Sequence, residues 1–126
     1  MHGTVLLLTS DRSPLVDVDV WRAQGLIVYE CHEPADALTY FERIVPDVIV
    51  AVLSGDEGPS LVAEMRRLAD HATSIIAASV PEQREAVRKA GADSFLLKSA
   101  SPSDFLSEIH RALILRRSGR RLPWNW

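Results

Sequence analysis

The sequence contains a single cysteine, Cys31, so it cannot build an internal disulfide framework. It also lacks long hydrophobic runs. The first apolar stretch, residues 5–8, is too short for a secretory signal and far below the roughly 20 residues of a membrane-spanning helix. Neither charge sign dominates, because 14 Lys and Arg stand against 17 Asp and Glu. We therefore expect a cytoplasmic protein that has neither nucleic acid nor membrane as a partner.

Histidine is scarce as well, and its spacing carries no metal signature. None of the four histidines is spaced from another, or from Cys31, as zinc ligands are. We therefore expect no metal site at these positions, which are His2, His32, His71 and His110.

Short apolar segments alternate along the chain with amphipathic ones. With 47% hydrophobic and 25% charged residues in 126 positions, the composition is that of one folded domain. Continuous apolar strands alternating with helices predict an α/β fold with a parallel, doubly wound sheet. The predicted strands are residues 5–8, 26–31, 48–53, 74–78 and 94–97, and the predicted helices are 15–23, 35–45, 61–69, 82–90 and 102–117. We assign residues 1–117 to the domain and 118–126 to a basic, tryptophan-containing tail.

Local signals refine the helices. The alternation of β-branched and acidic residues over 16–20 disfavours helix, so we expect a short or irregular first helix. Ser101 and Asp104 have capping-box spacing around Pro102, and Gly25 and Gly91 suit helix ends. We expect inward stripes of Leu61, Met65 and Leu68 in the third helix and of Phe105, Ile109 and Leu113 in the fifth.

One block of sequence resembles a known family. Residues 90–98 (Ala-Gly-Ala-Asp-Ser-Phe-Leu-Leu-Lys), followed by Ser101-Pro102 and a helix, resemble the fifth-strand region of two-component response-regulator receiver domains. Residues 46–53 and 74–80 are similar to the family's third and fourth strands. The resemblance extends from about Thr4 to Arg117. It implies a flavodoxin-like sheet of five parallel strands in the order 2-1-3-4-5, flanked by five helices.

The family also implies a chemistry. An aspartate at the end of the third strand accepts a phosphoryl group, and acidic residues after the first strand help to hold Mg²⁺. A hydroxyl after the fourth strand binds the phosphoryl group and couples it to an aromatic residue, and a lysine follows the fifth strand. In this chain the acceptor position falls on Val52, the acidic pair on Thr9 and Ser10 with Asp11 next, the hydroxyl on Ser79, the lysine on Lys98 and the aromatic on Phe95.

Val52 has no nucleophilic atom, and the loss of carboxylates removes the attraction that Mg²⁺ dehydration requires. We therefore expect an atypical receiver, not an enzyme, that needs no cofactor, binds Mg²⁺ weakly or not at all, and signals through protein contacts without phosphorylation. The resemblance implies docking or homodimerisation through the face formed by the fourth helix, fifth strand and fifth helix. The residues expected there are Arg84, Arg88, Lys89 and Asp93.

Other readings of the same residues stay open. Asp56 or Asp11 could be a displaced acceptor, or Lys98 and Ser79 could bind an anion in a metabolite sensor. The structural alternatives are an ion pair between Lys98 and Asp11, a backbone bond from Ser79, and turn chemistry for Asp56 and Glu57. The tail could dock on a partner or be a frayed end.

Overall fold

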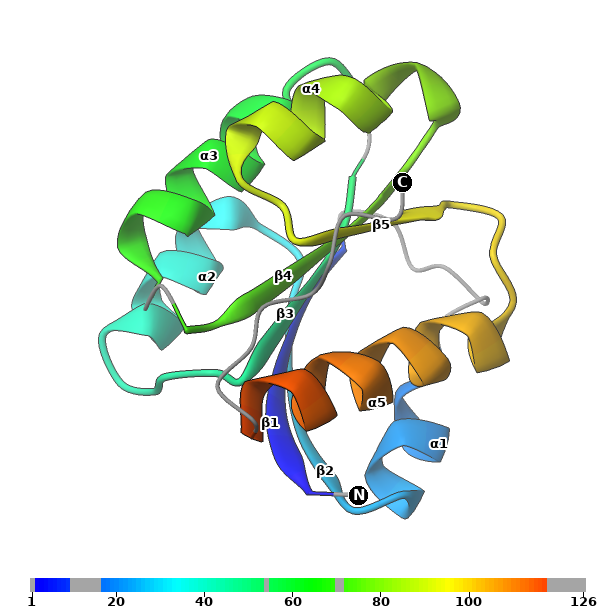
Figure 1. Ribbon diagram of the computed structural model, residues 1–126. Coiled ribbons are helices and arrows are strands. Elements are labelled where there is room, and N and C mark those ends of the chain that lie inside the picture. The colour runs from blue at the N-terminus through cyan, green and yellow to red at the C-terminus, as the bar shows by residue number, and fades with distance from the viewer. Residues whose placement is uncertain (1, 10–16, 54, 70–71, 118–126) are drawn as a thin grey trace.

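Five parallel strands form one sheet in a computed structural model that describes residues 2–9, 17–53, 55–69 and 72–117. The strands lie side by side in the order β2-β1-β3-β4-β5 (Figure 1). They are β1 (Gly3–Thr9), β2 (Leu26–Cys31), β3 (Val48–Val52), β4 (Ser74–Ser79) and β5 (Ser94–Leu97). The predicted fold class and strand order are confirmed.

Helices cover both faces of the sheet, which explains why the middle of each central strand is apolar. They are α1 (Val18–Ala23), α2 (Pro34–Phe41), α3 (Gly58–Leu68), α4 (Arg84–Ala90) and α5 (Pro102–Arg117). Figure 1 shows α1 and α5 on one face and α2, α3 and α4 on the other. Every residue of β3 and β4 is buried. A strand covered on both faces has no solvent side on which polar residues could alternate.

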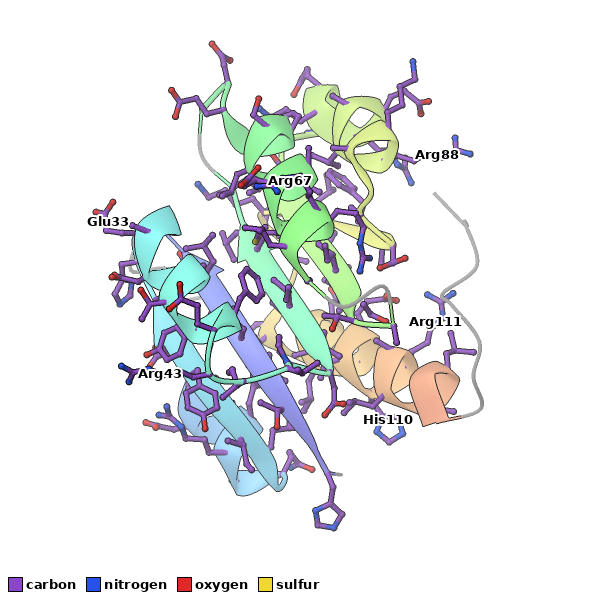
Figure 2. All side chains as sticks on the ribbon, turned by 90° about the vertical axis from the view of Figure 1, so that its left-hand side faces the viewer. Glu33, Arg43, Arg67, Arg88, His110 and Arg111 are labelled. Atoms are coloured by element: carbon purple, nitrogen blue, oxygen red, sulfur yellow. The ribbon has the colours of Figure 1, made fainter. Side chains whose placement is uncertain are left out.

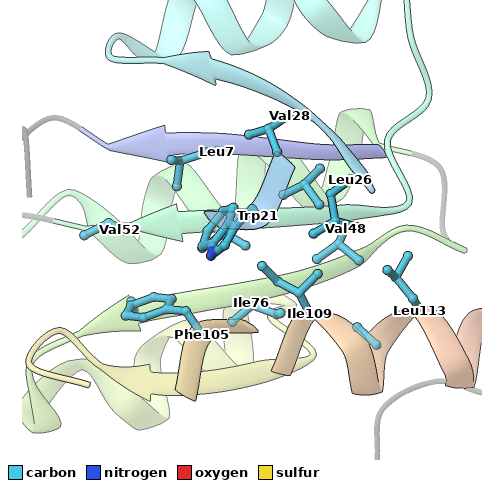
Figure 3. Close-up of a cluster of buried hydrophobic side chains, with 14 residues drawn as sticks. Leu7, Trp21, Leu26, Val28, Val48, Val52, Ile76, Phe105, Ile109 and Leu113 are labelled. Atoms are coloured by element: carbon cyan, nitrogen blue, oxygen red, sulfur yellow. The ribbon is translucent and has the colours of Figure 1, made fainter. Parts of the chain in front are cut away.

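The core on the α1 and α5 face is built around large side chains. Trp21, Phe105 and Ile109 are almost fully buried and pack with residues of the sheet (Figure 3). Burying side chains of this size stabilises a fold by roughly 1.5–3 kcal/mol each. Leu113 belongs to the same cluster, so the predicted inward stripe of the last helix is confirmed.

The first helix is short, as predicted. It begins only at Val18, and the Asp17 side chain caps it by accepting a hydrogen bond from the Val20 N–H at 3.2 Å. The last helix has the predicted bounds, and its capping box forms: the Asp104 N–H donates to Ser101 Oγ and the Ser101 N–H donates to Asp104 Oδ2, both at 3.2 Å. Gly91 ends α4 with φ +113°, a left-handed conformation that favours glycine.

Three predicted helices differ from those observed. Helix α2 ends at Phe41 rather than 45, because Val45 precedes Pro46 and a residue before proline avoids the helical region; Val45 is 60% exposed. Helix α3 starts at Gly58 and buries Val62 and Met65, whereas Leu68 lies 40% exposed at its end. The segment predicted as helix over 82–90 is a 3-10 turn, Pro81–Gln83, followed by α4.

Buried or half-buried carboxylates hold the amino-terminal edge of the sheet together. Asp47 Oδ2 accepts a hydrogen bond from the Thr4 N–H at 2.8 Å. Asp93 Oδ2 accepts one from the Ile75 N–H at 2.9 Å and pairs with Arg66 Nη1 at 3.0 Å. Arg66 also donates from Nη2 to the Thr73 carbonyl at 2.9 Å, so α3, β4 and β5 meet in one network.

Candidate functional site

The carboxyl-terminal edge of the sheet gathers four of the predicted site residues. Thr9 is paired with Val52 in the register of β1 and β3, and Val52 with Ala78 in that of β3 and β4. Ser79 is the last residue of β4, and the Lys98 N–H donates to its carbonyl at 2.9 Å. The parallel strands therefore bring Thr9, Val52, Ser79 and Lys98 to one edge, where open α/β sheets bind their ligands. Ser10 and Asp11, the other two residues predicted for this site, lie outside the described residues.

Val52 presents a hydrocarbon surface at the end of β3. Its side chain is only 4% exposed and belongs to the apolar cluster that includes Leu7, Ala78 and Phe105 (Figure 3). Thr9, its neighbour on β1, is buried as well. The end of β3 is therefore part of the core and offers no atom that could attack phosphorus.

Ser79 leaves β4 on the opposite face from Val52. Successive side chains of a strand alternate between faces, and Ala78 packs with Val52 while Ala77 packs on the side of α3 and α4. The Ser79 hydroxyl donates to Gln83 Oε1, and Gln83 Nε2 donates to the Gly55 carbonyl at 2.6 Å. The expected backbone bond from the hydroxyl is thus replaced by a side-chain bond. Gln83 was not predicted, because no local pattern links residues 55, 79 and 83.

The ionisable side chains described near this edge do not form a metal site. No group of three His, Cys, Asp or Glu residues in the described part of the chain could hold a metal ion. Mg²⁺ prefers hard oxygen ligands in octahedral geometry, whereas the described residues at this edge are the Val52 hydrocarbon, a buried threonine, the Ser79 hydroxyl and a lysine. These residues do not fit Mg²⁺. Asp56 and Glu57, in the loop after β3, are exposed.

A groove opens beside this edge, on the surface of α4, β5 and α5. It has a volume of about 600 Å³, and its lining comprises Pro81, Arg84, Phe95, Leu96, Leu97, Ser99, Ala100, Ser101 and Asp104. Phe95 is half-buried, and the Arg84 guanidinium lies 5.8 Å from the centre of its ring, within cation–π range. Leu97 is 46% exposed. The lining of the groove thus combines apolar side chains with one basic residue, Arg84, and one acidic residue, Asp104.

Three of the four residues predicted for the docking face are exposed. Arg84, Arg88 and Lys89 lie on the outer side of α4, and Figure 2 shows Arg88 projecting away from the body of the molecule. Arg88 pairs with Glu85 at 3.5 Å. The fourth, Asp93, does not belong to this surface. It is 6% exposed and engaged with Arg66 and the Ile75 N–H, because it closes the network at the amino-terminal edge.

The end of β2 carries a second hollow, of about 280 Å³, which sequence reasoning did not identify. Its lining includes Cys31, His32 and Tyr40 and three charged residues, Glu30, Asp36 and Arg43. His32 Nδ1 lies 2.9 Å from the Thr9 carbonyl, and Cys31 Sγ donates to the Leu7 carbonyl at 3.5 Å. Burial, and secondarily the negative charge of Asp36, raise the pKa of Cys31 to about 12. This thiol is therefore protonated and unreactive near neutral pH.

Sequence comparison and structure comparison give different results. No protein-family model matches the sequence, and no curated protein matches it at a significant level. The fold, by contrast, matches many solved structures. The chemotaxis response regulator CheY4 of Vibrio cholerae aligns with a TM-score of 0.74 at 20% identity, over 89% of this chain and 99% of that one.

Two further structures show the same fold. A two-component response regulator from Clostridium difficile aligns with a TM-score of 0.75 at 13% identity, over 88% of this chain and 95% of that one. NtrX from Brucella abortus aligns with a TM-score of 0.80 at 16% identity, over 94% of this chain but only 28% of that one. The chain therefore has the flavodoxin-like fold of response-regulator receiver domains. None of the helices in its described ranges is long and apolar enough to cross a membrane.

Proposed function

We propose that this chain is a receiver-type signalling domain that acts through protein contacts and does not depend on phosphorylation. The observation that carries the proposal is Val52: the position matching the family's phosphoacceptor ends β3 as a buried hydrocarbon. An acyl phosphate requires a carboxylate nucleophile at that position. The receiver fold supports the signalling role, because solved response regulators share it at low sequence identity.

The contact surface in this proposal is the groove on α4, β5 and α5. Its lining includes the exposed Leu97, the half-buried Phe95 and the charged Arg84. Interfaces are anchored by apolar and aromatic side chains together with arginine, so this groove has the composition of a docking site. A protein partner or a second copy of the chain would bind there.

Phosphorylation is tested by incubating the protein with acetyl phosphate and Mg²⁺ and measuring its intact mass. We expect no phosphoryl adduct on the native chain. A stoichiometric adduct that disappears in Asp56→Ala or in Asp11→Ala would identify a displaced acceptor and contradict the proposal. Val52→Asp is the matched control, because it restores a carboxylate at the acceptor position. A phosphoryl adduct on this variant but not on the native chain would show that the native chain lacks only the acceptor.

The docking surface is tested with two exposed aliphatic side chains, one on each of the two outermost strands of the sheet. Leu97 lies on β5 and is 46% exposed, whereas Ile27 lies on β2 and is 57% exposed. If copies of the chain pair through the groove, Leu97→Asp should lower the mass measured by sedimentation to that of a monomer. Ile27→Asp is the control and should leave the association unchanged; the reverse result would move the interface to the other edge.

A further inference from the structure

The side chain of Gln83 connects two loops at the carboxyl-terminal edge of the sheet. Its Oε1 accepts a hydrogen bond from the Ser79 hydroxyl, and its Nε2 donates to the Gly55 carbonyl at 2.6 Å. A carbonyl can only accept, so the bond to Gly55 fixes which end of the amide faces Ser79. We call these two hydrogen bonds the Gln83 bridge. It joins the end of β4 to the loop between β3 and α3.

Packing keeps the amide of Gln83 in this place. Gly58 begins α3, and a Cβ added to it would lie 3.2 Å from Gln83 Oε1 and 3.1 Å from Leu53 Cβ. The backbone of α3 therefore approaches the bridge so closely that a side chain at position 58 would press on it. The amide is thus held by hydrogen bonds at both its ends, beside the start of α3.

The next residue holds the aromatic side chain on β5. The Arg84 guanidinium lies 5.8 Å from the centre of the Phe95 ring. Gln83, the last residue of the 3-10 turn, thus contacts the hydroxyl of Ser79, and Arg84, the first residue of α4, contacts the ring of Phe95. Ser79 and Phe95 are the two positions that the receiver resemblance assigns to phosphoryl-dependent coupling.

We infer that Gln83 is a positioning residue that gives the Ser79 hydroxyl, from within the chain, the acceptor that a phosphoryl oxygen would otherwise supply. The inference rests on the proposed function, because it explains how the turn between β4 and α4 keeps one arrangement without phosphorylation. That turn contains Pro81 and leads directly into Arg84 at the start of α4, and both residues line the docking groove. The bridge therefore holds one wall of the groove ready for a partner.

Hydrogen exchange measured by NMR tests the inference in Gln83→Ala. The reporter amides are Leu53, which donates to the Ala78 carbonyl at 2.8 Å, and Lys98, which donates to the Ser79 carbonyl at 2.9 Å. Losing both hydrogen bonds of the bridge should accelerate their exchange by about fivefold or more, since about fivefold is expected for one net hydrogen bond. The Asp93 amide, which donates to the Ile75 carbonyl at 2.8 Å at the opposite edge, is the internal reference and should not change.

Two variants separate the halves of the bridge, and one serves as the control. Gln83→Glu keeps an acceptor for Ser79 but loses the donor to Gly55, and Ser79→Ala keeps only the bond to Gly55; each should give an intermediate acceleration. Glu82→Ala changes an exposed side chain of the same turn and should have no effect.

Equal exchange of Leu53 and Lys98 in Gln83→Ala and Glu82→Ala would overturn the inference. So would a uniform acceleration that includes Asp93, because it would make Gln83 a contributor to global stability only. Neither result depends on the phosphorylation assay. A phosphoryl adduct on the native chain would contradict the proposed function, and the exchange rates would still show whether the Gln83 bridge positions the turn.

Discussion

At the amino-terminal edge of the sheet, carboxylates accept hydrogen bonds from backbone N–H groups, whereas the described residues at the opposite edge include an amide, a hydroxyl, a lysine and the apolar Val52. Asp47 and Asp93 each accept a backbone hydrogen bond shorter than 3 Å, and Asp93 is also paired with Arg66. Among the described residues that end the strands at the other edge, Thr9, Cys31, Val52, Ser79 and Leu97, none is acidic.

The contrast separates what the fold needs from what the family's chemistry needs. A carboxylate that satisfies a buried N–H group cannot be lost without leaving that donor unpaired, so the fold itself requires Asp93. A carboxylate at the end of β3 is required only for phosphoryl chemistry, and Val52 packs there as a core residue. Changes at Cys31, Asp93 and Ser101 would test this contrast, in addition to the exchange experiment on Gln83.

The alkylation rate of Cys31 tests whether the carboxyl-terminal end of β2 is accessible to solvent. Burial raises the pKa of its thiol from 9.0 to about 12, with a smaller contribution from Asp36. Because the thiolate is the reactive form, a shift of this size lowers its fraction near pH 8 by about a thousandfold. Alkylation by iodoacetamide, followed by intact mass, should therefore be about a thousandfold slower in the native protein than in urea.

The same shift sets the direction of the pH dependence. The folded state keeps the thiol proton up to about pH 12 and the unfolded state loses it above 9, so this residue lowers the free energy of unfolding as the pH rises between those values. Native alkylation that matches the rate in urea at pH 8 would show that the end of β2 is open.

Substitution of Asp93 tests how much the hydrogen-bond network at the amino-terminal edge stabilises the fold. Asp93→Ala leaves the Arg66 guanidinium without its carboxylate and the Ile75 N–H without an acceptor. Breaking a buried pair in this way should lower the free energy of unfolding by roughly 3 kcal/mol, measured by urea denaturation. Asp56→Ala, in an exposed loop, is the matched control and should change it by less than about 0.5 kcal/mol. A loss below about 1 kcal/mol in Asp93→Ala would mean that the network contributes little.

The comparison also shows which features the sequence could predict. Continuous apolar strands, the capping box at Ser101 and the glycine at 91 are local patterns, and each was found in the structure. The end of α2 was missed although its cause, Pro46, is visible in the sequence.

Other features depend on contacts between distant segments and could not be predicted. Asp93 was expected on a docking face because the family resemblance implies docking through the fourth helix, fifth strand and fifth helix, but it is buried and paired with Arg66, 27 residues away. The Gln83 bridge likewise joins residues 28 apart through the Gly55 carbonyl. Hydrogen bonds between side chains that are far apart in the sequence produce no periodic pattern. The sequence therefore predicted which positions form the site but not the hydrogen bonds between them.

The smallest effect concerns the start of α5, beside Lys98 at the carboxyl-terminal edge. Ser101 Oγ accepts a hydrogen bond from the Asp104 N–H, and the Asp104 carboxylate accepts one from the Ser101 N–H. Ser101→Ala removes the first of these and should lower the free energy of unfolding by about 1 kcal/mol in urea denaturation. Ser107→Ala, at an exposed position within the same helix, is the control and should be neutral or slightly stabilising, because alanine favours helix. Equal effects of the two changes would mean that the cap does not stabilise α5.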